Sequence, residues 1–202
     1  MRKTTTTALA LLGLVALTPA AWGYCLTGLK WPTPPDANFY YKAAGKVTSG
    51  QCISSSQMDT AVTGQIGTWK ALTHAGSTTK KANKPDNTNV VGWANLGSQK
   101  GITNYIKYGT PLLTCGSNSF YRALEIDVRL ATAFRWSSTA GSCPCAAGSA
   151  FYLNAVAQHE FGHAVGLCHT NTPSSLMYPS FGVCENKSKG SDEGAGETAL
   201  CY

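Results

Sequence analysis

The stretch from His159 to His169 reads HEFGHAVGLCH and contains three of the four histidines in the chain. His159 and His163 are four residues apart, so a helix would present both imidazoles on one face. Neutral imidazole is a good zinc ligand, and three protein ligands leave one coordination position for water, the pattern of a catalytic zinc site. A chain that gathers these side chains around one ion needs a helix followed at once by a sharp return of the backbone.

Glu160 follows the first histidine and is expected beside the metal-bound water, where it takes a proton and returns it to a leaving amine. Gly166 comes three residues after His163. Because glycine adopts positive φ cheaply, we expect the helix to end there and the chain to turn back beneath the metal. His169 is then the third ligand. HExxH alone also fits a surface helix with two histidines, whereas the longer HExxHxxGxxH favours the metal site.

The segment 159–181, HEFGHAVGLCHTNTPSSLMYPSF, resembles the active-site segment of the matrixins, the matrix-metalloproteinase branch of the metzincins. The likeness includes the spacing from the third histidine to Met177, which fits the methionine turn, and the MYP tripeptide followed two residues later by Phe181. Thr170 stands where matrixins usually have serine. The resemblance is sharp over residues 152–181 and faint elsewhere.

The resemblance implies a single catalytic domain of mixed α/β class over residues 24–202. A twisted mixed sheet and two long helices would form an upper part, residues 24–166. A small irregular part with a C-terminal helix, residues 167–202, would form the floor, with Met177 packed beneath the zinc. The implied activity is zinc-dependent hydrolysis of peptide bonds, with the polypeptide substrate extended along a sheet edge.

The pocket beside the zinc is also inferred from the resemblance. Ala155 lies one turn before His159 on the same helix face, and in the family that position lines the pocket for the side chain just after the cut bond. Pro179 and Phe181 would form the outer wall. Because alanine is small, the pocket should be open, and we expect a preference for a medium or large apolar side chain there.

Residues 1–23 are interpreted as a secretory signal peptide, with a positive start, an apolar core too short for a stable membrane anchor, and Ala21-Trp22-Gly23 before the cut. The mature chain would begin at Tyr24 and be secreted, to the extracellular space or the periplasm, with no membrane segment. Cys25 would also fit a bacterial lipoprotein, but Tyr24 is too large for the position before a lipidated cysteine.

Charge gives little indication of a macromolecular partner other than substrate. The formal charge is +6, which becomes +4 once Arg2 and Lys3 are removed with the leader. The basic residues are spread along the sequence without interleaved aromatics, so nucleic acid is not expected. We expect a monomer that acts on polypeptides.

All eight cysteines follow position 24, and an even number in an exported protein indicates up to four disulfides. The pair in Cys143-Pro144-Cys145 could be half of a metal site, but no second such pair exists, so two structural bridges are favoured. A bridge from Cys168 to Cys184 is our hypothesis. The family's propeptide motif is absent, so Cys25 and Asp36 are the candidates for covering the zinc, although the even count favours a paired Cys25.

One zinc ion is expected. In the vertebrate matrixins, the region that corresponds to residues 137–148 carries histidine and aspartate ligands for a second zinc, and carboxylates for calcium. Here that segment contains no histidine and no acid. The sequence therefore indicates a single catalytic zinc and does not support calcium binding.

Hydrophobic periodicity predicts the other elements. It indicates strands over residues 37–41, 89–95, 102–108 and 124–130, the last alternating between apolar and charged side chains as a half-buried strand does. A helix is expected within 54–72, opened by a capping box of Ser54 with Gln57 or of Ser56 with Asp59. The polar stretch 73–89 reads as a loop, with His74 at the end of the preceding helix.

Two further helices are expected at the zinc site and at the C-terminus. The zinc helix would start near Leu153 or Asn154. A faint closing helix is expected within residues 190–202. In the family, an acid at its start can bind the mature N-terminal ammonium, a role for Asp192 or Glu193; the favoured alternative is a simple interaction of these acids with the helix dipole.

Two rival functions fit parts of the sequence. One is a secreted zinc-containing binding module without activity, which would not need Glu160. The other is a disulfide-rich structural protein with an accidental motif, which would not bind zinc stoichiometrically. The presence of Glu160 within the complete motif favours the protease.

Overall fold

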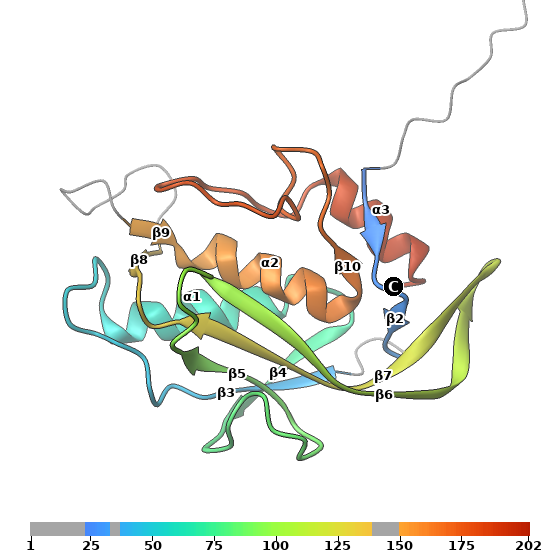
Figure 1. The fold of residues 1–202 in the computed structure, drawn as a ribbon, viewed down its shortest axis with the longest axis horizontal. Coiled ribbons are helices and arrows are strands. Elements are labelled where there is room, and N and C mark those ends of the chain that lie inside the picture. Colours follow the sequence, from blue (N-terminus) through green and yellow to red (C-terminus); the bar gives the residue numbers. More distant parts are fainter. Residues whose placement is uncertain (1–22, 33–36, 139–149) are drawn as a thin grey trace, which may run out of the picture.

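The computed structural model describes residues 23–32, 37–138 and 150–202 (Figure 1). The helices are α1 (Ser55–Ile66), α2 (Leu153–Val165) and α3 (Ser191–Ala199). The strands are β1 (Cys25–Leu26), β2 (Leu29–Lys30), β3 (Ala37–Tyr41), β4 (Leu72–Ser77), β5 (Asn89–Ala94), β6 (Gly101–Cys115), β7 (Asn118–Ala131), β8 (Arg135–Ser137), β9 (Ala150–Tyr152) and β10 (Leu167–Cys168). None of the helices in the described ranges is long and apolar enough to cross a membrane.

The main sheet is mixed, which confirms the predicted α/β class. Its strands run in the order β2-β7-β5-β3-β4, all parallel, and β6 pairs antiparallel with β7. Helices α1 and α2 lie together on one face of this sheet (Figure 1). The core between them includes Phe39 and Phe161, whose ring centroids are 5.5 Å apart. Among the described strands, β6 pairs with β7 alone, and it packs against α2, so a sheet edge borders the helix that carries two of the histidines.

Helix α1 opens with a capping box, as predicted. The Gln57 side chain accepts a hydrogen bond from the Ser54 backbone N–H at 2.8 Å, and the Ser54 hydroxyl accepts one from the Gln57 N–H at 3.3 Å. The helix ends at Ile66, earlier than the periodicity suggested. Trp69, beyond this end, is still buried in the core, and its indole N–H donates to the Gln158 carbonyl at 3.1 Å.

The prediction of a loop over residues 73–89 is wrong at its start. Residues 72–77 form β4, which runs parallel to β3 at the end of the sheet. His74 lies within this strand and not at a helix end, and it is exposed. The strand was hard to predict because backbone pairing with β3 defines it, whereas its mostly polar side chains show no alternation.

From Glu125 to Ala131, strand β7 is buried on both faces, although its alternating pattern predicted one face in water. Glu125 and Asp127 are completely buried, whereas Leu124 is 47% exposed. The two carboxylates accept hydrogen bonds from backbone N–H groups of the segment 83–90, which covers the sheet face opposite α1 and α2 (Figure 1). Backbone donors satisfy these charges, so a charged residue in the pattern did not mean exposure.

The disulfide hypothesis was also wrong. Cys168 pairs with Cys25, not with Cys184, and Cys115 pairs with Cys201. The first bridge joins β1 to β10, which lie antiparallel with Cys25 opposite Cys168. Because Cys25 is paired, it is not a free thiol that could cover a metal. Cys184 is disulfide-bonded as well. Asp36, the pair of cysteines at 143 and 145, and residues 1–22 of the predicted leader lie outside the described residues.

Candidate functional site

Helix α2 carries His159, Glu160 and His163 and ends at Gly166. Its buried residues, Phe161 among them, pack it onto the sheet. Gly166 has φ of 113°, and a Cβ atom there would lie 2.3 Å from the Leu29 carbonyl oxygen, so only glycine fits. This left-handed residue stops the helix and turns the chain into β10, and His169 follows directly.

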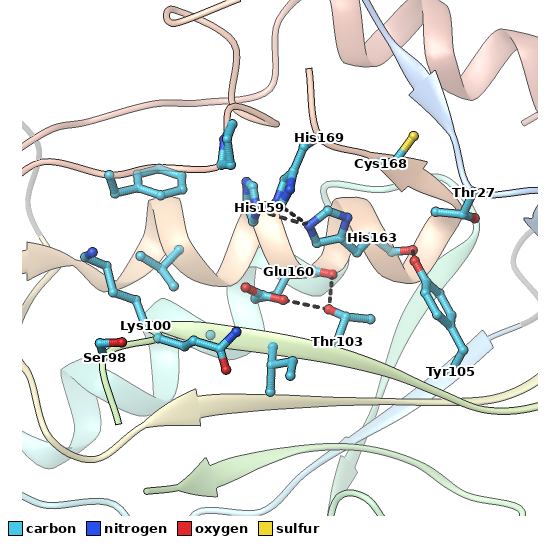
Figure 2. A pocket seen from close by; sticks show the side chains of 16 residues that line it. Thr27, Ser98, Lys100, Thr103, Tyr105, His159, Glu160, His163, Cys168 and His169 are labelled. Carbon is cyan, nitrogen blue, oxygen red and sulfur yellow. Dashed lines mark hydrogen bonds between the residues drawn. The ribbon is translucent and has the colours of Figure 1, made fainter. Parts of the chain in front are cut away.

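The three histidines meet around a single point (Figure 2). The Nε2 atom of His163 lies 3.1 Å from that of His159 and 3.1 Å from that of His169. The Nε2 atoms of His159 and His169 are 3.2 Å apart. A tetrahedral zinc with Zn–N bonds near 2.0–2.1 Å separates its nitrogen ligands by about 3.4 Å. The triangle therefore already has nearly the dimensions of a zinc-binding face.

The Nδ1 atoms of two of these rings have partners of their own. His159 Nδ1 lies 2.7 Å from the Leu176 carbonyl oxygen, and His163 Nδ1 lies 2.8 Å from that of Leu167. A carbonyl only accepts, so each Nδ1 carries the proton and each Nε2 presents a lone pair to the centre. Converging lone pairs repel one another, and a central cation removes that repulsion.

Burial keeps these imidazoles neutral. It lowers the pKa of His159 to about 3, with a further contribution from the nearby His163, and the pKa of His163 to about 4. The pKa of His169 is also lowered by burial. Metal ligands must be deprotonated, so this environment suits binding. Among the described residues, these histidines form the one group of three or more His, Cys, Asp or Glu side chains that could hold a metal.

Glu160 is 5% exposed and lies between α2 and β6. Thr103 on β6 donates its hydroxyl hydrogen to this residue, with its Oγ1 atom 2.7 Å from Glu160 Oε2 and 2.8 Å from the Glu160 carbonyl oxygen (Figure 2). Burial raises the pKa of Glu160 to about 7, and the Thr103 hydrogen bond opposes that rise. Thr103 could not be predicted from the sequence, because no motif links β6 to the helix.

Met177 lies beneath the histidines and is 1% exposed. Its Sδ atom would be 2.4 Å from a Cβ atom at Gly162, so the thioether touches the helix backbone between His159 and His163. The turn is held by Glu193 of α3, which accepts hydrogen bonds from the Ser175 hydroxyl at 2.6 Å and from the Met177 N–H at 3.2 Å. Glu193 thus supports the methionine turn, a role that the sequence did not suggest.

A pocket of about 500 Å³ opens beside this centre. Pro179 and Phe181 contribute to its lining, and the Phe181 ring stands edge-on to His159 with centroids 5.3 Å apart. Ala155 does not line the pocket. It is 1% exposed and packed in the core, where its short side chain does not reach the cavity, and Val156 lines the wall instead.

Comparison with known proteins points to one family. A family model described as Matrixin matches residues 48–194. Matrix metalloproteinase-20 from Homo sapiens is 61% identical over 31 residues, 15% of this chain and 6% of that protein. Neutrophil collagenase from Homo sapiens is 49% identical over 35 residues, 17% of this chain and 8% of that protein. Matrix metalloproteinase-9 from Canis lupus familiaris is 47% identical over 45 residues, 22% and 6% respectively. The chain thus aligns with a small part of each relative.

Proposed function

The chain belongs to the matrixin family, and from this premise we propose that it is a secreted zinc-dependent endopeptidase. The observation that carries the proposal is the triangle of three Nε2 atoms 3.1–3.2 Å apart, with the Glu160 carboxylate on the next residue of the same helix. His159, His163 and His169 would hold the ion. Zinc bound there would lower the pKa of a water molecule and polarise a peptide carbonyl.

Glu160 is the proposed general base and acid. Its carboxylate removes a proton from the attacking water and then delivers that proton to the leaving nitrogen, so no covalent enzyme intermediate is needed. Thr103 keeps the carboxylate oriented toward the pocket by its 2.7 Å hydrogen bond. Met177 has a structural role, because it is buried under the helix and away from the pocket lining.

The substrate is proposed to lie extended along β6. Among the described strands, β6 pairs only with β7, so it forms an edge of the sheet. An added strand gains main-chain hydrogen bonds, and pockets for alternate side chains give specificity. Val156 and Phe181 make the pocket beside His159 partly apolar. We retain the proposal of an apolar preference just after the cut bond. Equal cleavage before Gly, Asp and Leu in a peptide library would contradict it.

Secretion and the mature boundary at Tyr24 are part of the same proposal. The disulfides Cys25–Cys168 and Cys115–Cys201 support an oxidising compartment, because such bonds are rare in the cytosol. We propose that residues 24–202 form one catalytic domain that acts as a monomer.

The test compares the mature protein with a Glu160→Ala variant. Both are loaded with zinc, the bound metal is measured by mass spectrometry of the native protein, and peptide cleavage is mapped by liquid chromatography. We expect one zinc per chain in both, cleavage by the unmutated protein that a chelator stops, and a loss of at least about 100-fold in the variant.

The rival binding module makes a different prediction for the same samples. If both proteins hold one zinc and neither cuts any peptide of the library, the endopeptidase proposal fails and a zinc-containing binding module replaces it. If neither holds zinc, the metal site itself is rejected.

A further inference from the structure

Lys100 lies just before β6, at one end of the pocket that contains the three histidines. Figure 2 shows it near Ser98, at the end away from Thr27 and Tyr105. Its backbone position is fixed, because its carbonyl accepts a hydrogen bond from the Ala131 N–H at 2.9 Å. The backbone of Lys100 is therefore held in place as part of the pocket wall.

The ammonium group of Lys100 rests on aromatic rings. Its Nζ atom is 4.4 Å from the Phe151 ring centroid and 5.6 Å from that of Phe134. These two rings meet edge to face, with centroids 5.3 Å apart. An ammonium on an aromatic face is held in place while some of its hydrogen-bonding capacity remains unused.

No carboxylate neutralises this ammonium within the described part of the chain. Ion pairs are found there for Lys46, Lys80, Lys187 and Lys189, but not for Lys100. The pocket lining contains one acid, Glu160, and Lys100 is its one lysine or arginine. Because Glu160 is held by Thr103, the Lys100 end of the pocket is left with an uncompensated positive charge.

We propose that Lys100 selects peptide substrates with an acidic side chain on the carboxyl side of the cut bond. This inference rests on the proposed function and defines its substrate class. Phe181 and Val156 lie in the same pocket, and they are the walls proposed to receive the first side chain after the cut. An aspartate or glutamate one or two positions further along would then meet the ammonium on its aromatic platform. The site is thus apolar beside the histidines and cationic at its end.

Paired quenched peptides test this directly. Each pair has Leu just after the cut bond and differs by Glu or Gln at one of five positions, which are the three before the bond and the second and third after it. For the unmutated protein, kcat/KM should be about five-fold higher for Glu than for Gln at the second or third position after the bond, the size expected of a partly exposed ion pair. The ratio should stay near one before the bond and should shrink at high salt.

Four variants separate charge from packing. Lys100→Gln should bring the Glu to Gln ratio close to one, Lys100→Arg should keep the ratio of the unmutated protein, and Lys100→Glu should invert it, so that the Gln peptide is cut faster than the Glu peptide. Lys81→Gln removes the same charge from an exposed residue outside this pocket and should keep the full ratio. An unchanged ratio in Lys100→Gln, or an equal fall in Lys81→Gln, overturns the proposal.

The role of Lys100 can be tested separately if the endopeptidase proposal fails. Should the zinc-loaded protein cut no peptide, binding of the same Glu and Gln peptides to the Glu160→Ala variant is measured by fluorescence anisotropy. Tighter binding of the Glu peptide that disappears in the Glu160→Ala, Lys100→Gln double variant supports the role of Lys100. Equal binding of both peptides rejects it.

Discussion

Gly162 lies between two of the histidines, where the Met177 thioether meets the helix backbone. A Cβ atom at Gly162 would be 2.4 Å from Met177 Sδ and 3.0 Å from Trp69. Gly162, three residues after His159, is therefore required by its packing against Met177 and Trp69. The zinc motif alone does not indicate this requirement. Met177 and Gly162 act together, one as the floor and the other as the space for it.

We predict that Gly162→Ala destabilises the protein by about 1–3 kcal/mol, because overpacking at this contact forces Met177 or the helix to shift. The control is Gly64→Ala in α1, where a Cβ atom meets nothing within 4 Å. That substitution should stabilise by about 0.5–1 kcal/mol through helix propensity. Denaturant unfolding of both variants measures the difference, and equal effects would reject the packing argument.

Thr103 should determine the pH below which activity is lost. Glu160 works as a base only when ionised, and burial raises its pKa to about 7 while the Thr103 hydrogen bond lowers it. Activity is therefore lost as the pH falls through this pKa. Removing the hydrogen bond in Thr103→Ala should move the acid limb of kcat/KM to higher pH. The positive charge of bound metal shifts the limb of every variant downward but preserves their order.

The conservative variant is the control for that pH profile. Thr103→Ser keeps the hydroxyl and should keep the limb of the unmutated protein. If the alanine and serine variants have the same limb, Thr103 does not influence the ionisation of Glu160.

Among the elements, β7 departs most from its sequence pattern. Two buried acids of β7 accept hydrogen bonds from backbone N–H groups of the segment 83–90. Asp127 accepts one from Val90 at 2.8 Å and one from Lys84 at 3.3 Å. Glu125 accepts from the N–H groups of Asp86 and Asn87, each at 2.9 Å. The carboxylates thus fix a long connection against the outer face of the sheet.

We predict that Asp127→Ala destabilises the fold by about 2–4 kcal/mol, because it leaves several backbone donors without an acceptor. Lys84→Ala retains the backbone N–H and removes an exposed side chain, so its effect should lie within about 0.5 kcal/mol. Thermal unfolding compares the two, with hydrogen exchange of residues 83–90 as a local probe. Equal stability of both variants would show that the carboxylate is not needed.

Elements were predictable where one local rule decides them. The capping box at Ser54, the strand 37–41 and the start of α2 at Leu153 agree with the sequence-based expectations. Strand β5, Asn89–Ala94, ends one residue before its predicted end, and β6 extends well past Tyr108 to Cys115. The errors at β4 and on the outer face of β7 arose where partners distant in sequence supply the hydrogen bonds.

At the scale of the whole molecule, the first described residues meet the last helix. The backbone N–H groups of Gly23 and Tyr24 donate to Asp192 at the start of α3, whose Oδ2 atom is buried and has no hydrogen-bond partner among the described residues. The two acids at this helix start therefore divide their roles, because Glu193 supports the methionine turn. Cleavage before Tyr24 would place a terminal ammonium beside Asp192.

We predict that a chain beginning at Tyr24 is more stable than one that keeps Gly23 and a short extension. The gain should be no more than about 1 kcal/mol, because the pair is partly exposed and screened. An ammonium beside a carboxylate has a raised pKa, so the gain is present below its ordinary value near 7.7–8.0 and is lost as the pH rises above it. Melting curves at pH 6 and 10 measure this.

Asp192→Asn is the matching control for the N-terminal prediction. It should abolish the difference between the two N-termini at pH 6. A difference that persists in this variant, or one that is the same at both pH values, would exclude the ion pair.

The tertiary structure also redistributes charge that looked evenly spread. Lys42, Lys81, Lys84 and Arg129 come from separate parts of the chain and line one pocket of about 430 Å³, away from the histidines. Proximity along the sequence gave no sign of this grouping. It arises because β3, β5, β7 and the segment before β5 meet in the folded sheet.

The sequence by itself determined the chemistry of the centre. The spacing of His159, His163 and His169 around Gly166 obeys the geometry of one helix and one turn, which short-range rules describe. Only the tertiary structure decided that Cys25 pairs with Cys168, that Thr103 holds Glu160 and that Lys100 ends the pocket. These contacts join residues that the sequence keeps far apart, and they depend on strand order and register, which no local pattern specifies.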